Sequence, residues 1–214
     1  MNNVDLILQN LITRYPVLEP VQESVRQAYE ALESCYQRDG KLLLAGNGGS
    51  CSDAEHIVGE LMKGFVKKRP LPEDMRQALT AADSSHGRTL ADSLQGSLTA
   101  ISLTGHPSLS TAFLNDVDGE MAYAQQLYGY GRKGDVFLAI STSGNAKNID
   151  YAVTVAKAKN ILTIGLTGKD GGRLAQRADV AIIVPEHETY KIQELHLPIY
   201  HALCLMLEER FFEE

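Results

Sequence analysis

The chain has 214 residues, of which 44% are hydrophobic and 22% charged, so it can bury a core without a disulfide framework or a structural metal. Twenty Lys and Arg against 27 Asp and Glu give a formal charge of -7, which argues against nucleic-acid binding as the main activity. No apolar run reaches the roughly 20 residues of a membrane span, and an odd number of cysteines, three, favours a reducing cytoplasm.

The first 40 residues place apolar side chains at helical spacing and are interrupted by Pro16 and Pro20, which predicts two helices joined by a turn. Residues 41–45 form a short apolar run that suits a strand buried on both faces. A glycine-rich loop follows at 46–50, and an apolar stripe then predicts a helix over 53–65.

The same alternation of strand and helix continues to the end of the chain. Further strands are predicted at 98–103, 136–140, 161–166 and 180–184, and further helices at 109–128, 148–159 and 190–211. Short Gly-rich links join them, which is typical of parallel sheets. We therefore expect an α/β fold: a doubly wound parallel sheet of five strands flanked by helices, with N-terminal helices and a long C-terminal helix.

Residues 69–97 break this rhythm. They contain two prolines, a short helical run at 73–82 and a polar turn at 84–87, and no strand is predicted in them. We expect a surface insertion in a single domain over 1–214; a lid, an interface element and a variable excursion all stay open. A local basic patch stands at its start: Lys63, Lys67, Lys68 and Arg69.

Two loops have the composition of an anion site. Gly46-Asn47-Gly48-Gly49-Ser50 and Ser141-Thr142-Ser143-Gly144-Asn145 both follow strands and precede helices, where free backbone amides point outward. Any tight turn uses such residues, but two loops of this kind favour phosphate. Cys51 replaces the third glycine of a dinucleotide fingerprint, and no Gly-Lys-Ser/Thr follows either loop, so a small phosphorylated molecule is the better ligand.

Candidate chemical groups lie on two predicted helices. His56 and Glu60 are four residues apart and share a face. The last helix carries four further polar residues: Gln193, Glu194, His196 and His201. Gln193 and His201 lie about 80° apart on the helical wheel, and His196 points away. Such a set could bind Zn²⁺ or another divalent ion, act as acid and base on a sugar, or simply form an ordinary polar face.

The motifs, taken together and in order, resemble the phosphoheptose isomerase branch of the sugar isomerase (SIS) domain family. The resemblance rests on the two loops, on Asp53-Ala54-x-His56, on Leu166-Thr167-Gly168-Lys169-Asp170-Gly171-Gly172, and on Ile192-Gln193-Glu194-x-His196 with His201. It implies a homotetramer with active sites between subunits, and isomerisation of sedoheptulose 7-phosphate to D-glycero-D-manno-heptose 7-phosphate through an enediol.

The resemblance also implies residue roles. Glu60 and His201 would be the acid/base pair, in an order that stays open. Zinc would be bound by His56, Glu60, Gln193 and His201. The phosphorylated sugar would be bound by Asn47, Gly48, Gly49, Ser50, Asn115, Asp116, Ser141, Thr142, Ser143, Asn145 and Gln193.

Two positions depart from the family pattern. Ala146 stands where another phosphate-binding Ser is usual, and Tyr190 stands where a substrate-contacting Asp is usual. The second departure leaves the sugar open, including an amino sugar phosphate. A non-catalytic SIS protein that senses a phosphosugar, or an adaptor of the replication-initiator-binding type, is the alternative to an enzyme.

Overall fold

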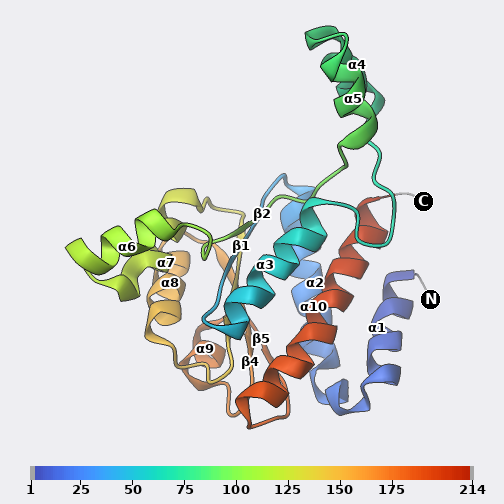
Figure 1. The fold of residues 1–214 in the computed structure, drawn as a ribbon. Coiled ribbons are helices and arrows are strands. Elements are labelled where there is room, and N and C mark those ends of the chain that lie inside the picture. The colour runs from blue at the N-terminus through green and yellow to red at the C-terminus, as the bar shows by residue number, and fades with distance from the viewer. Residues whose placement is uncertain (1–2, 213–214) are drawn as a thin grey trace.

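The computed structural model describes residues 3–212. Its centre is one sheet of five parallel strands in the order β2-β1-β3-β4-β5. The strands are β1 (Leu42–Ala45), β2 (Ala100–Ser102), β3 (Val136–Ser141), β4 (Leu162–Thr167) and β5 (Val180–Ile183). The predicted doubly wound α/β fold is confirmed, since helices cover both faces of this sheet (Figure 1).

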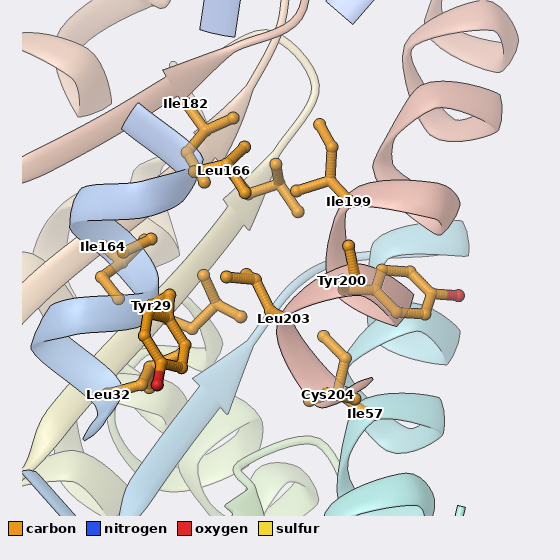
Figure 2. Close-up of a cluster of buried hydrophobic side chains, with 14 of the residues drawn as sticks. Tyr29, Leu32, Ile57, Ile164, Leu166, Ile182, Ile199, Tyr200, Leu203 and Cys204 are labelled. Atoms are coloured by element: carbon orange, nitrogen blue, oxygen red, sulfur yellow. The ribbon is translucent and has the colours of Figure 1, made fainter. Parts of the chain in front are cut away.

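The two faces have separate cores because alternate strand residues point to opposite sides. One face packs against α2 (Gln22–Gln37), α3 (Gly49–Met62) and α10 (Thr189–Phe211), and α1 (Asn3–Arg14) packs against α10. The other packs against α7 (Ala122–Tyr130), α8 (Lys147–Ala158) and α9 (Gly172–Arg177). Figure 2 shows the first core, where Ile199 and Leu203 of α10 meet the strand residues Ile164 and Leu166.

Two helix predictions need correction. The helix predicted over 109–128 is broken into α6 (Pro107–Asp116) and α7, with a short 3-10 helix, η2 (Gly119–Met121), between them. The break arises at Asp118, whose side chain accepts a hydrogen bond from the backbone N–H of Glu120 and so caps a new turn. Helix α3 also begins earlier than predicted, at Gly49.

The insertion forms a helical hairpin. Helix α4 (Glu73–Ala82) matches the predicted run, but α5 (His86–Ser93) was not predicted. Asp83 caps α5, because its Oδ1 accepts from the backbone N–H groups of Ser85 and His86 at 2.9 and 2.8 Å. The two helices pack mainly on each other and stand beyond the C-terminal end of α3 (Figure 1). The hairpin therefore does not cover the glycine-rich loops as a lid here.

The predicted basic patch is wrong, because three of its four cations are paired with carboxylates. Arg69 is buried against Glu208, Lys67 pairs with Glu209 at 2.8 Å, and Lys63 Nζ lies 3.2 Å from Glu60 Oε2. Across residues 3–212, no helix is long and apolar enough to cross a membrane.

Candidate active site

The two predicted anion-binding loops, 46–50 and 141–145, lie side by side at the point where the strand order reverses. Strands β1 and β3 are neighbours, with Ala45 paired to Ala139, so their carboxyl ends meet at one edge of the sheet. The side chains of Asn47 and Asn148 exchange two hydrogen bonds of 2.9 Å across this edge. Open α/β sheets bind ligands at such a switch point.

The first loop depends on two glycines. Gly48 has φ 56°, a left-handed conformation that favours glycine. Gly49 starts α3 without a side chain, and a Cβ there would collide with the amide of Gln193 on α10. Ser50, in the first turn of α3, is 3% exposed. The loop therefore brings backbone amides, a hydroxyl and the Gln193 amide to one place.

The second loop is held against α9. Gly144 has φ 65°, and a Cβ there would collide with the backbone carbonyl of Gly171. Asn145 donates to the carbonyl of Ser143 at 3.0 Å and accepts from the backbone N–H of Arg173 at 3.1 Å. The Asn145 side chain thus holds the loop in shape, and the loop links Ser141 at the end of β3 to α8, which begins at Lys147.

Three of the four predicted metal ligands meet between α3 and α10. His56 Nε2 lies 3.2 Å from Glu60 Oε1, and the rings of His56 and His201 are 5.0 Å apart, nearly perpendicular. Glu60 is 14% exposed on its side chain. The predicted acid/base candidates, Glu60 and His201, therefore lie in one cluster, which we call the His56–Glu60–His201 cluster.

The environment of His201 favours its neutral form. Burial lowers the pKa of His201, repulsion between the two imidazoles when both are protonated lowers it further, and Glu60 opposes both. The Nε2 atom of His201 is buried and has no hydrogen-bond partner. A buried nitrogen in this state is one that a substrate hydroxyl or a metal ion would satisfy.

Gln193 is separated from this cluster. It precedes His201 by eight residues, about 12 Å along α10, and its amide lies against Gly49 at the first loop. Within the described residues, no group of three or more His, Cys, Asp and Glu side chains is arranged to hold a metal ion. The donor types and the free His201 nitrogen fit zinc, whereas the four side chains do not surround one point.

Other predicted residues lie elsewhere. Asn115 and Asp116 are exposed on α6, where Asn115 donates to Asp116 Oδ1 at 2.7 Å. Figure 1 places α6 far from α10, so a single chain does not bring this pair to the cluster. His196 points away as predicted: it is buried, with Nε2 3.3 Å from the carbonyl of Thr167, and burial lowers its pKa to about 4. Tyr190 is 56% exposed at the start of α10.

One site residue was missed by the sequence patterns. The hydroxyl of Tyr200 lies 3.0 Å from His56 Nδ1 and donates to Asp53 Oδ1 at 3.3 Å. Tyr200 follows Gln193 by seven residues and therefore shares its helix face, which was the available signal. A tyrosine among apolar neighbours is usually a core residue, so the pattern alone gave it no chemical role.

Comparison with known proteins identifies relatives of this chain. Residues 109–207 match the family model of the SIS domain. A phosphoheptose isomerase from Aneurinibacillus thermoaerophilus is 40% identical over 185 residues, covering 86% of this chain and 80% of that protein. A phosphoheptose isomerase from Nitratiruptor sp. is 37% identical over 209 residues, covering 96% and 98%.

Solved structures point the same way. A phosphoheptose isomerase from Neisseria gonorrhoeae has a TM-score of 0.73 at 32% identity, with 96% of each chain covered. One from Francisella tularensis has a TM-score of 0.72 at 28% identity, covering 97% of this chain and 99% of that one. The fold is thus that of an SIS-domain protein. More narrowly, the chain belongs to the phosphoheptose isomerase family.

Proposed function

We propose that this protein is an aldose-ketose isomerase that converts sedoheptulose 7-phosphate to D-glycero-D-manno-heptose 7-phosphate through an enediol. Membership of the phosphoheptose isomerase family supports the substrate. The observation that carries the chemistry is the meeting of Glu60 and His201 beside His56, between the helices α3 and α10. A carboxylate and a neutral imidazole together can move protons near neutral pH.

The phosphate would bind at the two loops. Ser50, Ser141, Thr142 and Ser143 offer hydroxyls, and the starts of α3 and α8 offer amides. Gly48 and Gly49 allow the anion to approach the backbone, and Asn47 would line the sugar site. Such a site needs no cation, which is compatible with the acidic chain.

The spacing along α3 supports a long substrate. From Ser50 to His56 the helix rises about 9 Å, so a sugar anchored by its phosphate must extend several carbons to reach the cluster. One of Glu60 and His201 would take the proton from the carbon next to the carbonyl, and the other would serve the oxygen. Either assignment gives the enediol and, by the reverse transfer, the aldose.

We also propose a divalent cation, Zn²⁺, held by His56, Glu60, Gln193 and His201. When bound, it would supply a Lewis acid that polarises the sugar carbonyl. The unpartnered Nε2 of His201 supports this, while the position of Gln193 makes it the residue to test. Zn²⁺ affinity, measured by competition with a chromogenic chelator, should fall sharply in His201→Ala. An unchanged affinity in Gln193→Ala would leave a three-residue site.

The assembly we propose is a homotetramer with active sites between subunits, in the cytoplasm, with neither nucleic acid nor membrane as partner. Leu114 and Val117, beside the Asn115–Asp116 pair, are 72% and 64% exposed, as a helix awaiting a neighbouring subunit would be. The three cysteines Cys35, Cys51 and Cys204 are unpaired, which suits a reducing compartment. Light scattering would give the mass in solution.

The decisive experiment is to incubate the protein with sedoheptulose 7-phosphate and follow aldose formation by NMR. Glu60→Gln and His201→Ala should each lower kcat by roughly 10²–10⁴-fold. The matched controls are Glu73→Gln and His86→Ala on the hairpin, whose side chains are 73% and 84% exposed. Turnover of an amino sugar phosphate instead would correct the substrate, and binding without turnover of any phosphosugar would contradict an enzyme.

A further inference from the structure

The residue that sequence patterns missed, Tyr200, lies in an unusual position for a core aromatic. Its side chain belongs to the core beside Leu203 and is 2% exposed. Figure 2 shows that its hydroxyl points away from the strands. There the oxygen meets two polar side chains of α3: His56 through Nδ1 at 3.0 Å and Asp53 through Oδ1 at 3.3 Å.

Counting protons gives this contact a direction. A phenol has one proton, and an ionised carboxylate only accepts hydrogen bonds. A phenol, whose ordinary pKa is about 10, keeps this proton at neutral pH. That proton is donated to Asp53. The phenol oxygen can then only accept from His56, which requires a proton on Nδ1.

We propose, resting on the proposed function, that Asp53 and Tyr200 are positioning residues that fix His56 in its Nδ1–H form and present the Nε2 lone pair to the active site. Nε2 faces Glu60 Oε1 at 3.2 Å. The lone pair of His56 Nε2 and the lone pairs of the Glu60 carboxylate repel each other at 3.2 Å unless a proton or a cation lies between the two atoms. The relay therefore holds the pair ready for a proton on Glu60 or for a divalent cation.

Packing alone does not account for these three residues. A Phe at position 200 would fill the same volume, and Asp53 is costly in this place, because its Oδ2 is buried without a partner. The ring of Tyr200 also lies 5.0 Å from that of His201, nearly perpendicular, so the same side chain contacts both histidines of the cluster. Partners of this kind around a ligating histidine set its tautomer and orientation.

The first test reads the tautomer directly from ¹⁵N chemical shifts of histidine-labelled protein, with His56 assigned by the signals lost in His56→Asn. The wild type should have the Nδ1–H form. Tyr200→Phe should give a mixture of forms. In Asp53→Asn, the amide can donate to the phenol oxygen, so the hydroxyl turns to His56 Nδ1 and the Nε2–H form should dominate.

The matched control is Tyr36→Phe, which removes a hydroxyl bonded to the carbonyl of Thr99 at 3.2 Å and should leave the His56 signals unchanged. Thermal unfolding of each variant checks that it is folded. If Tyr200→Phe does not fold, Asp53→Asn alone tests the proposal. Wild-type shifts in folded Tyr200→Phe and Asp53→Asn would overturn the proposal, as would an Nε2–H form in the wild type.

The second test measures Zn²⁺ affinity by chelator competition. When a histidine that binds a metal loses the partner of its other ring nitrogen, metal affinity typically falls roughly 10- to 100-fold. We expect this loss of Zn²⁺ affinity in Tyr200→Phe and Asp53→Asn, and no loss in Tyr36→Phe. The double variant should lose no more than the worse single one, because both act through His56; additive losses would contradict the relay. Neither readout needs turnover, so failure of the isomerase proposal and failure of this one are distinguishable.

Discussion

Arg69 and Glu208, 139 residues apart in the chain, form a fully buried ion pair, with Nε 2.8 Å from Oε1. Arg69 also donates to the carbonyls of Leu61 and Glu60 at the end of α3. Glu208 accepts backbone N–H bonds from residues 65–67. The pair therefore joins the C-terminal ends of the two helices that carry the His56–Glu60–His201 cluster, at the base of the hairpin.

Removing one partner of this pair should be costly. Arg69→Met leaves the Glu208 carboxylate buried without its cation, and we expect a loss of about 3–5 kcal/mol in the free energy of unfolding. Urea denaturation measures it. Arg76→Met is the matched control, because Arg76 and its partner Asp92 have side chains that are 34% and 60% exposed. This substitution should lower the free energy of unfolding by no more than about 1 kcal/mol. Equal losses in the two variants would contradict the assignment.

The same pair predicts how stability changes with pH. Burial alone would raise the pKa of Glu208, but hydrogen bonds from the backbone of Val66 and Phe65 and from Arg69 outweigh it, so the pKa is lowered. A lowered folded-state pKa contributes stability above the unfolded value of 4.5, and this stability is lost as pH falls through the folded pKa. The urea midpoint, measured from pH 7 downwards, should fall in the wild type and should fall less steeply in Glu208→Gln. Equal slopes in the two proteins would refute the role of Glu208.

The two loops should respond differently to alanine. Gly144→Ala combines a left-handed backbone with a collision against the carbonyl of Gly171, whereas Gly48→Ala has the left-handed backbone and open space around the new Cβ. We expect Gly48→Ala to cost about 1–2 kcal/mol and Gly144→Ala clearly more. Urea unfolding at one pH compares them. A smaller loss in Gly144→Ala than in Gly48→Ala would mean that the second loop can open.

The hairpin should be dispensable for the stability of a single chain. Helix α4 has no buried residue and α5 has only Gly87 and Ala91, while Pro70 and Gln95 lie opposite each other at its base. Replacing residues 72–94 by Gly-Ser-Gly should change the free energy of unfolding by no more than about 2 kcal/mol, since a shorter loop costs less entropy to close. Circular dichroism during urea unfolding measures it, and loss of the cooperative transition would show that the hairpin supports the core.

Local patterns predicted the parts of this protein that local physics decides. Short apolar runs predicted the five strands, and runs of Gly, Ser, Thr and Asn predicted both loops. A strand buried on two faces and a tight strand-to-helix turn each leave a continuous signal in the sequence. The spacing of His56 and Glu60 likewise placed both on one helix face. The break at Asp118 was missed because apolar side chains continue across it at helical spacing.

Long-range pairings left no such signal. Lys67 and Arg69 were interpreted as a basic patch because their carboxylate partners, Glu209 and Glu208, lie at the far end of the chain. No local pattern predicted a role for Tyr200 either, because that role depends on Asp53 and His56, more than 140 residues earlier in the chain. The distance of Gln193 from His201 follows from α10 alone, but its place beside Gly49 at the first loop follows from how α3 and α10 pack.

The division of the cluster between α3 and α10 has a consequence for folding. Contacts between residues so distant in sequence form only after the intervening chain has been organised, and they pay the largest cost in loop entropy. During synthesis the first three strands are complete before His201 is made, so a chain of that length cannot bring Glu60 and His201 together. Under the proposed acid/base roles, turnover requires Glu60 and His201 to meet, which makes regained turnover a stricter test of refolding than regained helix content.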